Sequence, residues 1–285
     1  MANVDLRPMT LGEVLDRTFT LYRENFLLFA GIAALPYLVM LIFNFGLLFF
    51  ISQSPATSGP RLPSSGLVGG VVLGTFGALL LMLVLVGIAQ AATVSAVSEL
   101  FLGRQTTVGE SYARAKDKIL TVLAIMIVTA LAAGVGFLLL IVPGIYLACR
   151  LALSVPASVV EQESPAPSMA RSMELSKGHA GQIFLLLLLV TVLTYVVTAI
   201  LQLPAMVFSV SAALAKQQPS LAVSAYSYVA QFVSQVIVGP VGTISTVLMY
   251  YNLRVKKEGF DIQHLMNSLD NVPRPLADPV APVTR

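Results

Sequence analysis

Residues 26–51 read FLLFAGIAALPYLVMLIFNFGLLFFI and contain no Asp, Glu, Lys or Arg. A helix needs about 20 apolar residues to cross the hydrocarbon core of a bilayer, so this stretch is long enough to span one. Further runs without a charged residue follow at 62–98, 119–149, 178–215 and 217–253. The recurrence of such runs predicts an all-α, polytopic integral membrane protein whose helices form a bundle.

The composition agrees with this fold class. Hydrophobic residues make up 56% and charged residues 11% of the 285 residues, and the mean hydropathy is +0.85, whereas soluble domains carry about 25% charged residues. We predict a single membrane domain over residues 1–270 and a Pro-rich, disordered cytoplasmic tail over residues 271–285. The six predicted spans cover residues 26–51, 68–92, 119–142, 145–162, 183–208 and 231–252.

The fourth of these spans is the weakest, because it is short and includes Arg150 and Pro156. Proline removes a backbone hydrogen bond from a helix interior, and a charge in hydrocarbon is unfavourable. A partial or tilted helix is therefore the alternative to a full crossing at residues 145–162.

The basic residues are distributed unevenly between the two ends of the predicted spans. Of the 17 Lys and Arg residues, only Arg61 and Lys216 lie on one side and only Arg150 lies within a span, while all others flank the opposite side. The positive-inside rule then places both termini in the cytoplasm. These basic segments would also attract anionic lipid, by about 1 kcal/mol per residue near the surface, although orientation alone also explains their distribution.

A short polar phrase occurs twice, as TLGEVLDR at 10–17 and TVGESYAR at 107–114. In both copies, a Thr followed three residues later by Glu is the capping box that starts a helix. Apolar side chains then recur every three or four residues, so each phrase opens an amphipathic helix that lies at the membrane surface and leads into a span. A degraded third copy, MARSMELSK at 169–177, aligns with LDRTFTLYR at 15–23.

The three copies predict interfacial helices at residues 10–25, 107–118 and 165–180. Because all three enter from the same side, we expect a divergent threefold repeat about an axis along the membrane normal. The repeat places Arg17, Arg114 and Arg171 at matching positions. These arginines are candidate contacts for a lipid headgroup or another anion; in the alternative interpretation the phrase only starts each helix.

Polar residues within the apolar runs are the other candidates. Arg150 is the one charge inside a predicted span and is a candidate contact for a headgroup or anion. Because it follows the predicted outer turn at Pro143-Gly144, its side chain is expected either to snorkel to the outer interface or to pair within the bundle. The amide side chains in the runs are Asn44, Gln90, Gln202, Gln231 and Gln235. They either join helices by hydrogen bonds or line a polar cavity.

No catalytic or metal-binding pattern stands out in the sequence. The two histidines, His179 and His264, are far apart and lack metal-ligand spacing, and neither a P-loop nor a G-x-S-x-G motif occurs. We therefore expect a non-enzymatic protein without a cofactor or metal ion and without a nucleic-acid partner.

Four segments carry a resemblance to a known family. They are LRPMTLGEVLDRTFTLYRENF at 6–26, IVPGIYLACRLALSVPASVVE at 141–161, SMARSMELSKGH at 168–179 and YYNLRVKKEGFDIQHL at 250–265. These segments resemble the bacterial glycerophosphoryl diester phosphodiesterase membrane domain and related multi-span families. In proteins that give the family its name, this module is fused to a phosphodiesterase domain, which this sequence lacks. The resemblance implies a module of the bacterial inner (plasma) membrane concerned with lipids, without hydrolase activity, and it identifies no active-site residue.

Two hypotheses for function follow. The first is a lipid-interacting or scaffold module that contacts membrane lipids, anionic ones among them, and a protein partner or a second copy of the chain. The alternative is a transporter or permease subunit with a polar cavity around Arg150 and some of the amides. A transporter requires an open cavity at mid-membrane, whereas a scaffold packs shut there. A lipid-modifying enzyme, the third class, would require ionisable groups that converge at one interface.

Overall fold

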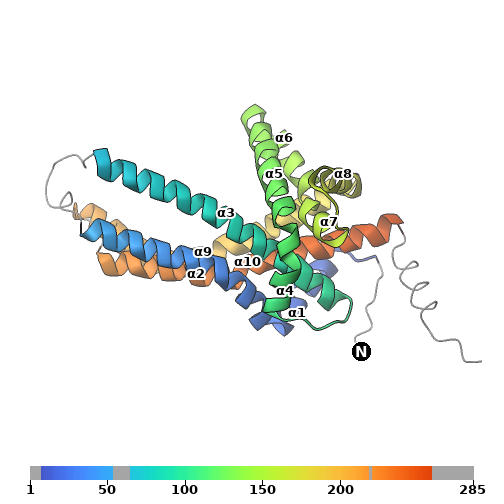
Figure 1. The fold of residues 1–285 in the computed structure, drawn as a ribbon, viewed down its shortest axis with the longest axis horizontal. Helices are drawn as coiled ribbons and strands as arrows, with labels where there is room; N and C mark the ends of the chain where they lie inside the picture. Colours follow the sequence, from blue (N-terminus) through green and yellow to red (C-terminus); the bar gives the residue numbers. More distant parts are fainter. Residues whose placement is uncertain (1–7, 54–64, 218–219, 259–285) are drawn as a thin grey trace, which may run out of the picture.

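The computed structural model describes residues 8–53, 65–217 and 220–258, and the regular elements within these ranges are helices (Figure 1). Six segments are long and apolar enough to cross a membrane, which confirms the predicted number. They are Phe26–Phe50, Gly69–Phe101, Val108–Leu138, Ile141–Val160, Ala180–Leu214 and Leu221–Glu258. The all-α membrane fold is thus confirmed, while the predicted tail at 271–285 lies outside the described residues.

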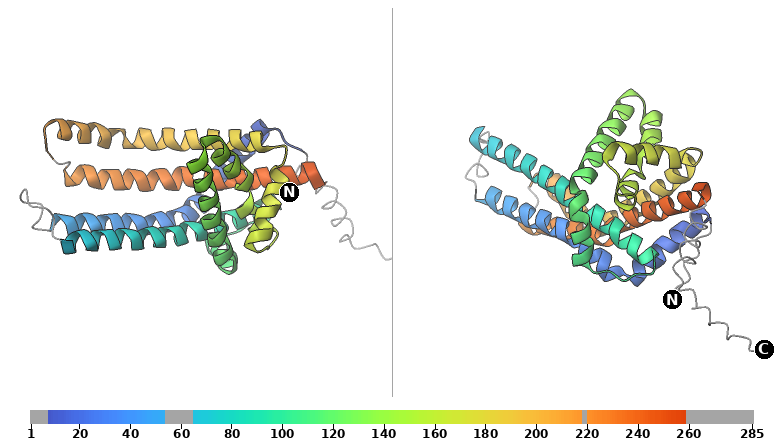
Figure 2. Two further views of the ribbon diagram at one scale, coloured as in Figure 1. Left: turned by 90° about the horizontal axis from the view of Figure 1, so that it is seen from above. Right: turned by 45° about the vertical axis from the view of Figure 1, so that its right-hand side comes forward.

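Four long helices lie side by side in a bundle (Figures 1 and 2). They are α2 (Phe26–Ser52), α3 (Ser65–Phe101), α9 (Ala180–Leu214) and α10 (Leu221–Glu258). The 38 residues of α10 measure about 57 Å at about 1.5 Å per residue, which exceeds the hydrocarbon core of about 30 Å. The ends of the long helices therefore extend beyond the hydrocarbon.

Helix α10 is the centre of the packing. It contacts α1, α2, α3, α7, α8 and α9, and its C-terminal half is buried almost continuously from Val238 to Val255. The side chain of Asn252, which is buried there, accepts a hydrogen bond from the backbone N–H of Met9 (2.8 Å) and donates one to the Met9 carbonyl (3.1 Å). The chain just before the first helix is thereby fixed against α10.

The third and fourth apolar segments do not run along this bundle. α5 (Ile119–Leu139) and α6 (Ile141–Leu151) form a hairpin that stands crosswise to the long helices (Figures 1 and 2). The two helices of the hairpin approach closely because glycines face each other. A Cβ on Gly136 would lie 2.8 Å from the Cα of Gly144, which is too close for a larger residue. The chain reverses at Leu140 rather than at the predicted Pro143-Gly144, since Pro143 lies in the first turn of α6, where its missing N–H leaves no bond unmade.

The fourth predicted span is a broken helix. α6 ends at Leu151, and α7 (Ser154–Val160) begins after Ala152 and Leu153. Pro156 is the third residue of α7, a position at which a helix tolerates proline because the N–H has no intrahelical acceptor. The range 145–162 therefore contains two helices, while Ile141–Val160 as a whole is long and apolar enough to cross a membrane. The full crossing and the partial or tilted helix both stay predictions.

Helices form where the sequence predicts interfacial ones: α1 (Leu11–Glu24), α4 (Val108–Ala115), which continues into the 3-10 turn η2 (Lys116–Lys118), and α8 (Pro165–Ser176). Their location at the membrane surface stays a prediction. Both capping boxes are confirmed: the Glu13 carboxylate accepts from the Thr10 N–H (2.6 Å), and the Glu110 carboxylate accepts from the Thr107 N–H (3.0 Å). Helix α8 starts after Ser164 without a side-chain cap. The threefold relation between the three units stays a prediction.

Tyrosine hydroxyls approach the backbone near each proline of the long helices. Pro36 removes the N–H that would bond to the carbonyl of Ile32, and the Tyr112 hydroxyl donates to that carbonyl at 2.7 Å. Tyr112 belongs to α4, so this bond joins an interfacial helix to α2. A carbonyl in hydrocarbon has no water to bond with, so the tyrosine hydroxyl stabilises the helix by replacing the missing donor.

Near the other two prolines, a tyrosine hydroxyl donates to the carbonyl three residues before the proline instead of four. Tyr22 of α1 donates to the carbonyl of Ile237, three residues before Pro240. Burial raises the pKa of Tyr22 to about 12, so its hydroxyl stays protonated and able to donate. In the same way the Tyr226 hydroxyl donates to the carbonyl three residues before Pro204, at 2.8 Å.

We predict that Tyr112→Phe lowers the free energy of unfolding by about 1 kcal/mol, because the Ile32 carbonyl would lose its donor inside the membrane. Unfolding in mild detergent, followed by circular dichroism, measures this loss. The matched control is Tyr195→Phe, since the Tyr195 side chain is 72% exposed and forms no hydrogen bond with another described residue.

The proline provides a second control. In a Pro36→Ala background, residue 36 regains an N–H for the Ile32 carbonyl, so Tyr112→Phe should lower stability by less than in the natural sequence. An equal loss in both backgrounds would contradict the pairing of this hydroxyl with the proline break.

Candidate functional site

The bundle contains an open cavity of about 620 Å³ between α2, α3, α9 and α10, whose wall is mostly apolar and carries several neutral polar groups. Its lining residues are Tyr37, Met40, Leu41, Asn44, Met82, Gln202, Ser227, Tyr228, Gln231, Phe232 and Gln235. None of these side chains carries a formal charge. The polar groups are amides and hydroxyls, which both donate and accept hydrogen bonds.

Two smaller spaces adjoin this cavity. A pocket of about 190 Å³ shares Tyr37 with it and is lined further by Gln90, Thr93 and Thr243. A narrow apolar crevice between α2 and α3 shares Met40 and Met82 with the cavity. The crevice lies between the middle of α2 and the middle of α3, while the N-terminal end of α3 stands away from α2 in Figure 1. The three spaces are thus neighbours that share lining residues.

Several polar groups on the walls lack a protein partner. Within the described residues, the amides of Gln90 and Gln235 and the hydroxyls of Tyr37 and Tyr228 form no hydrogen bond with another residue. Leaving such groups unpaired in an apolar environment is unfavourable by roughly 1–3 kcal/mol each. A bound molecule or water in the cavity would supply the missing partners.

Other amides join helices, as the alternative sequence interpretation expects. The Gln202 amide of α9 donates to the Ser227 carbonyl (3.1 Å) and to the Gln231 side chain (3.4 Å) of α10. The hydroxyls of Thr198 and Ser234 form a further bond of 2.8 Å between the same two helices. Both sequence interpretations of the amides therefore apply, each to different residues.

Arg150 does not line this cavity. Its guanidinium donates to the Tyr146 hydroxyl (3.4 Å) and lies 5.7 Å from the centre of that ring. Its backbone carbonyl accepts hydrogen bonds from the hydroxyls of Ser172 (2.7 Å) and Ser176 (3.3 Å) of α8. The helix break after Leu151 thus leaves Arg150 beside an interfacial helix. The guanidinium thus contacts Tyr146 of α6, and α8 contacts the backbone carbonyl. The cavity between the long helices is not the one predicted around Arg150, and snorkelling of its side chain to an interface stays a prediction.

The three arginines at matching sequence positions have three different environments. Arg17 lies on the exposed face of α1. Arg114 of α4 pairs with Glu99 at the end of α3 (2.9 Å), and Arg104 approaches the same carboxylate at 3.8 Å. A cavity of about 440 Å³ beside this pair is lined by Glu99, Arg114, Asp117 and Lys118 among others. Its charges are of both signs.

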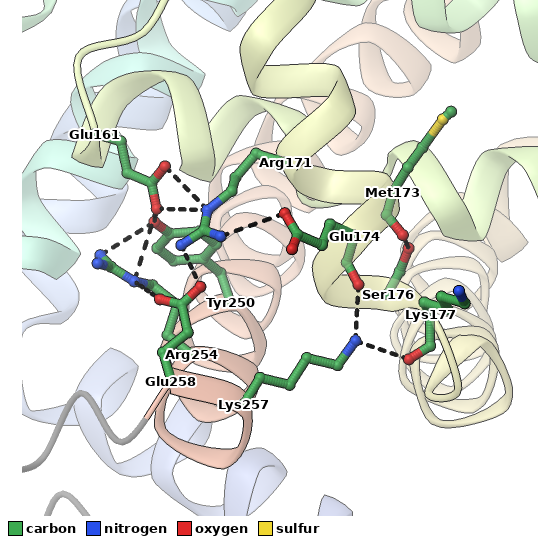
Figure 3. Close-up of polar contacts among 10 residues, drawn as sticks. All are labelled: Glu161, Arg171, Met173, Glu174, Ser176, Lys177, Tyr250, Arg254, Lys257 and Glu258. Atoms are coloured by element: carbon green, nitrogen blue, oxygen red, sulfur yellow. Dashed lines mark hydrogen bonds and ion pairs between the residues drawn. The ribbon is translucent and has the colours of Figure 1, made fainter.

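Arg171 belongs to a cluster of ionisable side chains from α8, α10 and the residue after α7 (Figure 3). Its Nε donates to both carboxylate oxygens of Glu161 (3.1 and 3.2 Å), and its terminal nitrogens pair with Glu258 and with Glu174 (3.6 Å). Burial alone would lower the pKa of Arg171, but hydrogen bonds and charge interactions with Glu161 and Glu258 outweigh it and raise the pKa. The side chain therefore remains charged.

Glu161 is the centre of this cluster. It also accepts a hydrogen bond from the Tyr250 hydroxyl (2.6 Å) and pairs with Arg254 (3.6 Å), both on α10. Lys257 adds a further link, because its ammonium donates to the carbonyls of Glu174 (2.7 Å) and Lys177 (2.8 Å) at the C-terminal end of α8. A cation at this end of a helix also interacts favourably with the helix dipole. The cluster thus fastens α7 and α8 to the end of α10.

The convergence of these groups does not by itself make an enzyme site. Each arginine of the cluster faces carboxylates from the protein itself, as Figure 3 shows. Among the described residues, no group of three or more His, Cys, Asp or Glu side chains could hold a metal ion. Sequence reasoning missed Glu161, Tyr250 and the Arg254–Glu258 pair, although the four-residue spacing of that pair is a recognisable helix signal.

We predict that Glu161→Gln lowers the free energy of unfolding by about 2 kcal/mol, because two largely buried guanidinium groups would lose their shared carboxylate. Glu174→Gln is the matched control: this carboxylate also contacts Arg171, but it is 73% exposed against 19% for Glu161. Its loss should change stability by no more than about 0.5 kcal/mol. Equal effects of the two substitutions in detergent unfolding would contradict the central role of Glu161.

Comparison with known proteins gives one match. A family model described as the membrane domain of glycerophosphoryl diester phosphodiesterase matches residues 122–272, just over half of the chain. The match includes most of α5, all of α6 to α10, the cluster around Glu161 and the amides of α9 and α10 that line the cavity. No curated protein and no solved structure matches the chain. The chain therefore belongs to the family of the membrane domain of glycerophosphoryl diester phosphodiesterase.

Proposed function

We propose that this protein is a non-enzymatic membrane module that binds an amphipathic lipid within its helix bundle. The observation that carries the proposal is the open cavity of about 620 Å³ between α2, α3, α9 and α10, in which amide and hydroxyl groups are set in a mostly apolar wall. Its volume lies in the range of small-molecule sites, about 300–1,000 Å³. Polar groups set in an apolar wall suit an amphipathic ligand.

The same cavity is not expected in a protein that serves only as a scaffold. A scaffold packs shut between its helices, whereas here Gln90, Gln235 and Tyr37 face the open space without a partner among the described residues. Empty cavities in proteins are normally apolar, and polar ones contain water or a ligand. The binding function is therefore better supported than a purely structural role.

Binding of anionic lipid by Arg17, Arg114, Arg150 and Arg171 stays a prediction. The structure offers reasons against two of these residues, because Arg114 pairs with Glu99 and Arg171 with Glu161 and Glu258. A headgroup would have to replace these carboxylates. Arg17, which is exposed on α1, and Arg150 beside Tyr146 remain the better candidates.

A transporter or permease subunit is the second candidate function, and the cavity favours it as well. Pro36 and Pro240 line the adjoining pocket, and proline breaks allow helices to bend during a transport cycle. The two functions differ in the consequence of binding: a transporter moves its ligand across or between leaflets, whereas a binding module retains it.

We further propose that the module lies in the bacterial inner membrane with both termini in the cytoplasm. The support is that α1, α4 and the C-terminal end of α10, which carry basic residues, gather at one end of the bundle (Figure 1). The hydrolysis named in the family description is not carried over, because the match is to the membrane domain. A protein partner or a second copy of the chain remains a further proposal.

The proposed function predicts that a lipid-sized molecule stays bound after gentle extraction. Native mass spectrometry of the wild-type protein should detect it, and Ser227→Phe should reduce the bound fraction about tenfold, because the new ring would fill the cavity that Ser227 lines. Ser211→Phe is the matched control, since Ser211 is an exposed serine on α9 outside this lining.

Either of two results would overturn the binding function: wild-type protein without a bound molecule, or equal retention in both phenylalanine variants. If the molecule is bound, flux measurements in vesicles separate the two candidate functions. Movement of that molecule between leaflets favours the transporter, and retention without movement favours the binding module.

A further inference from the structure

Resting on the proposed function, we infer that the ligand of this site is a glycerolipid with an uncharged headgroup, of the diacylglycerol class, rather than a phospholipid. The sequence predicts contacts between arginines and anionic lipid, but the site between the long helices is lined by uncharged side chains. The kind of ligand that it can bind follows from these lining residues.

Among the described residues, those that line the site include no Lys, Arg, His, Asp or Glu. This holds for the main cavity, for the adjoining pocket and for the apolar crevice. A phosphate brought into such a site would lose its water without gaining a cation, which is strongly unfavourable in a low-dielectric environment. A fatty-acid carboxylate would meet the same penalty. The lining therefore selects against anionic headgroups.

The polar groups of the walls suit hydroxyl and ester oxygens. A glycerol hydroxyl both donates and accepts, and an ester carbonyl only accepts. The unpaired amides of Gln90 and Gln235 can donate and accept, and the hydroxyls of Tyr37 and Tyr228 can donate. These four side chains come from α2, α3 and α10, so they can surround a headgroup from several sides.

The crevice between α2 and α3 has a volume of about 20 Å³ and cannot hold an acyl chain. The acyl chains of a bound glycerolipid would instead lie in the bilayer, beside the exposed apolar residues of α3. A small polar solute would make no use of that apolar surface. Met40 and Met82 line both the crevice and the main cavity, and flexible methionine side chains adapt readily to the shape of a ligand.

A route from the bilayer is also present. The outer face of α3 near the crevice exposes Val72, Leu73 and Phe76, each at least 60% exposed, and such residues face lipid in a membrane. The N-terminal end of α3 diverges from α2 (Figure 1). A lipid already in the bilayer can contact these residues, and we expect its headgroup to enter the open cavity from there.

The test uses the full-length protein in mild detergent and an equimolar mixture of dioleoylglycerol, dioleoylphosphatidylglycerol and dioleoylphosphatidylethanolamine, with bound lipid read by native mass spectrometry. We expect dioleoylglycerol to be retained in preference to both phospholipids. Gln235→Leu should weaken its retention by about five- to tenfold, because one amide donor is lost. Gln90→Leu, which removes the other unpaired amide, is a second variant in case the first is poorly folded.

Gln182→Leu is the matched control, because Gln182 is an exposed amide on α9 outside the lining. It should retain dioleoylglycerol like the wild type. Preferential retention of either phospholipid would overturn the uncharged-headgroup inference while leaving lipid binding in place. Retention of none of the three, or equal retention of all three in every variant, would overturn both this inference and the proposed function.

Discussion

A backbone carbonyl inside a bilayer has no water to bond with, and this constraint shapes the whole arrangement of helices. Pro36 leaves the carbonyl of Ile32 without its helical donor, and Tyr112 supplies one at 2.7 Å. Tyr22 reaches α10 near Pro240 in a related way. The two tyrosines belong to α4 and α1, so the bends of the spanning helices are held by the short helices at the end of the bundle.

The same constraint applies to the polar groups of the cavity. Where a tyrosine donates to a carbonyl, the protein itself supplies the hydrogen-bond partner. Around the cavity, by contrast, the Gln90 and Gln235 amides face an open space between helices. Pro36 and Pro240 also line that region. Two of the prolines in the long helices therefore lie beside the polar groups that require a ligand or water.

Local signals in the sequence predicted the local structure well. Thr10 with Glu13 and Thr107 with Glu110 form capping boxes because both partners lie within one helical turn. Charge-free runs predicted six membrane segments because length and composition decide that property. The site could not be predicted, since Glu161 and Arg254 meet only when α10 packs beside α7, and the location of Arg150 depends on a helix break that no local pattern fixes.

Charged side chains and neutral polar side chains lie in different parts of the molecule, which favours a site that selects uncharged ligands. Charged side chains that are partly withdrawn from water, such as Arg171, Glu161 and Arg254, are paired with one another at the end of the bundle. The space between the long helices is polar but uncharged. If this space served an ion or a charged headgroup, an opposite charge on its wall would offset the loss of hydration, as it does within the cluster. Its absence from the lining indicates a ligand that brings hydrogen-bonding oxygens and no net charge.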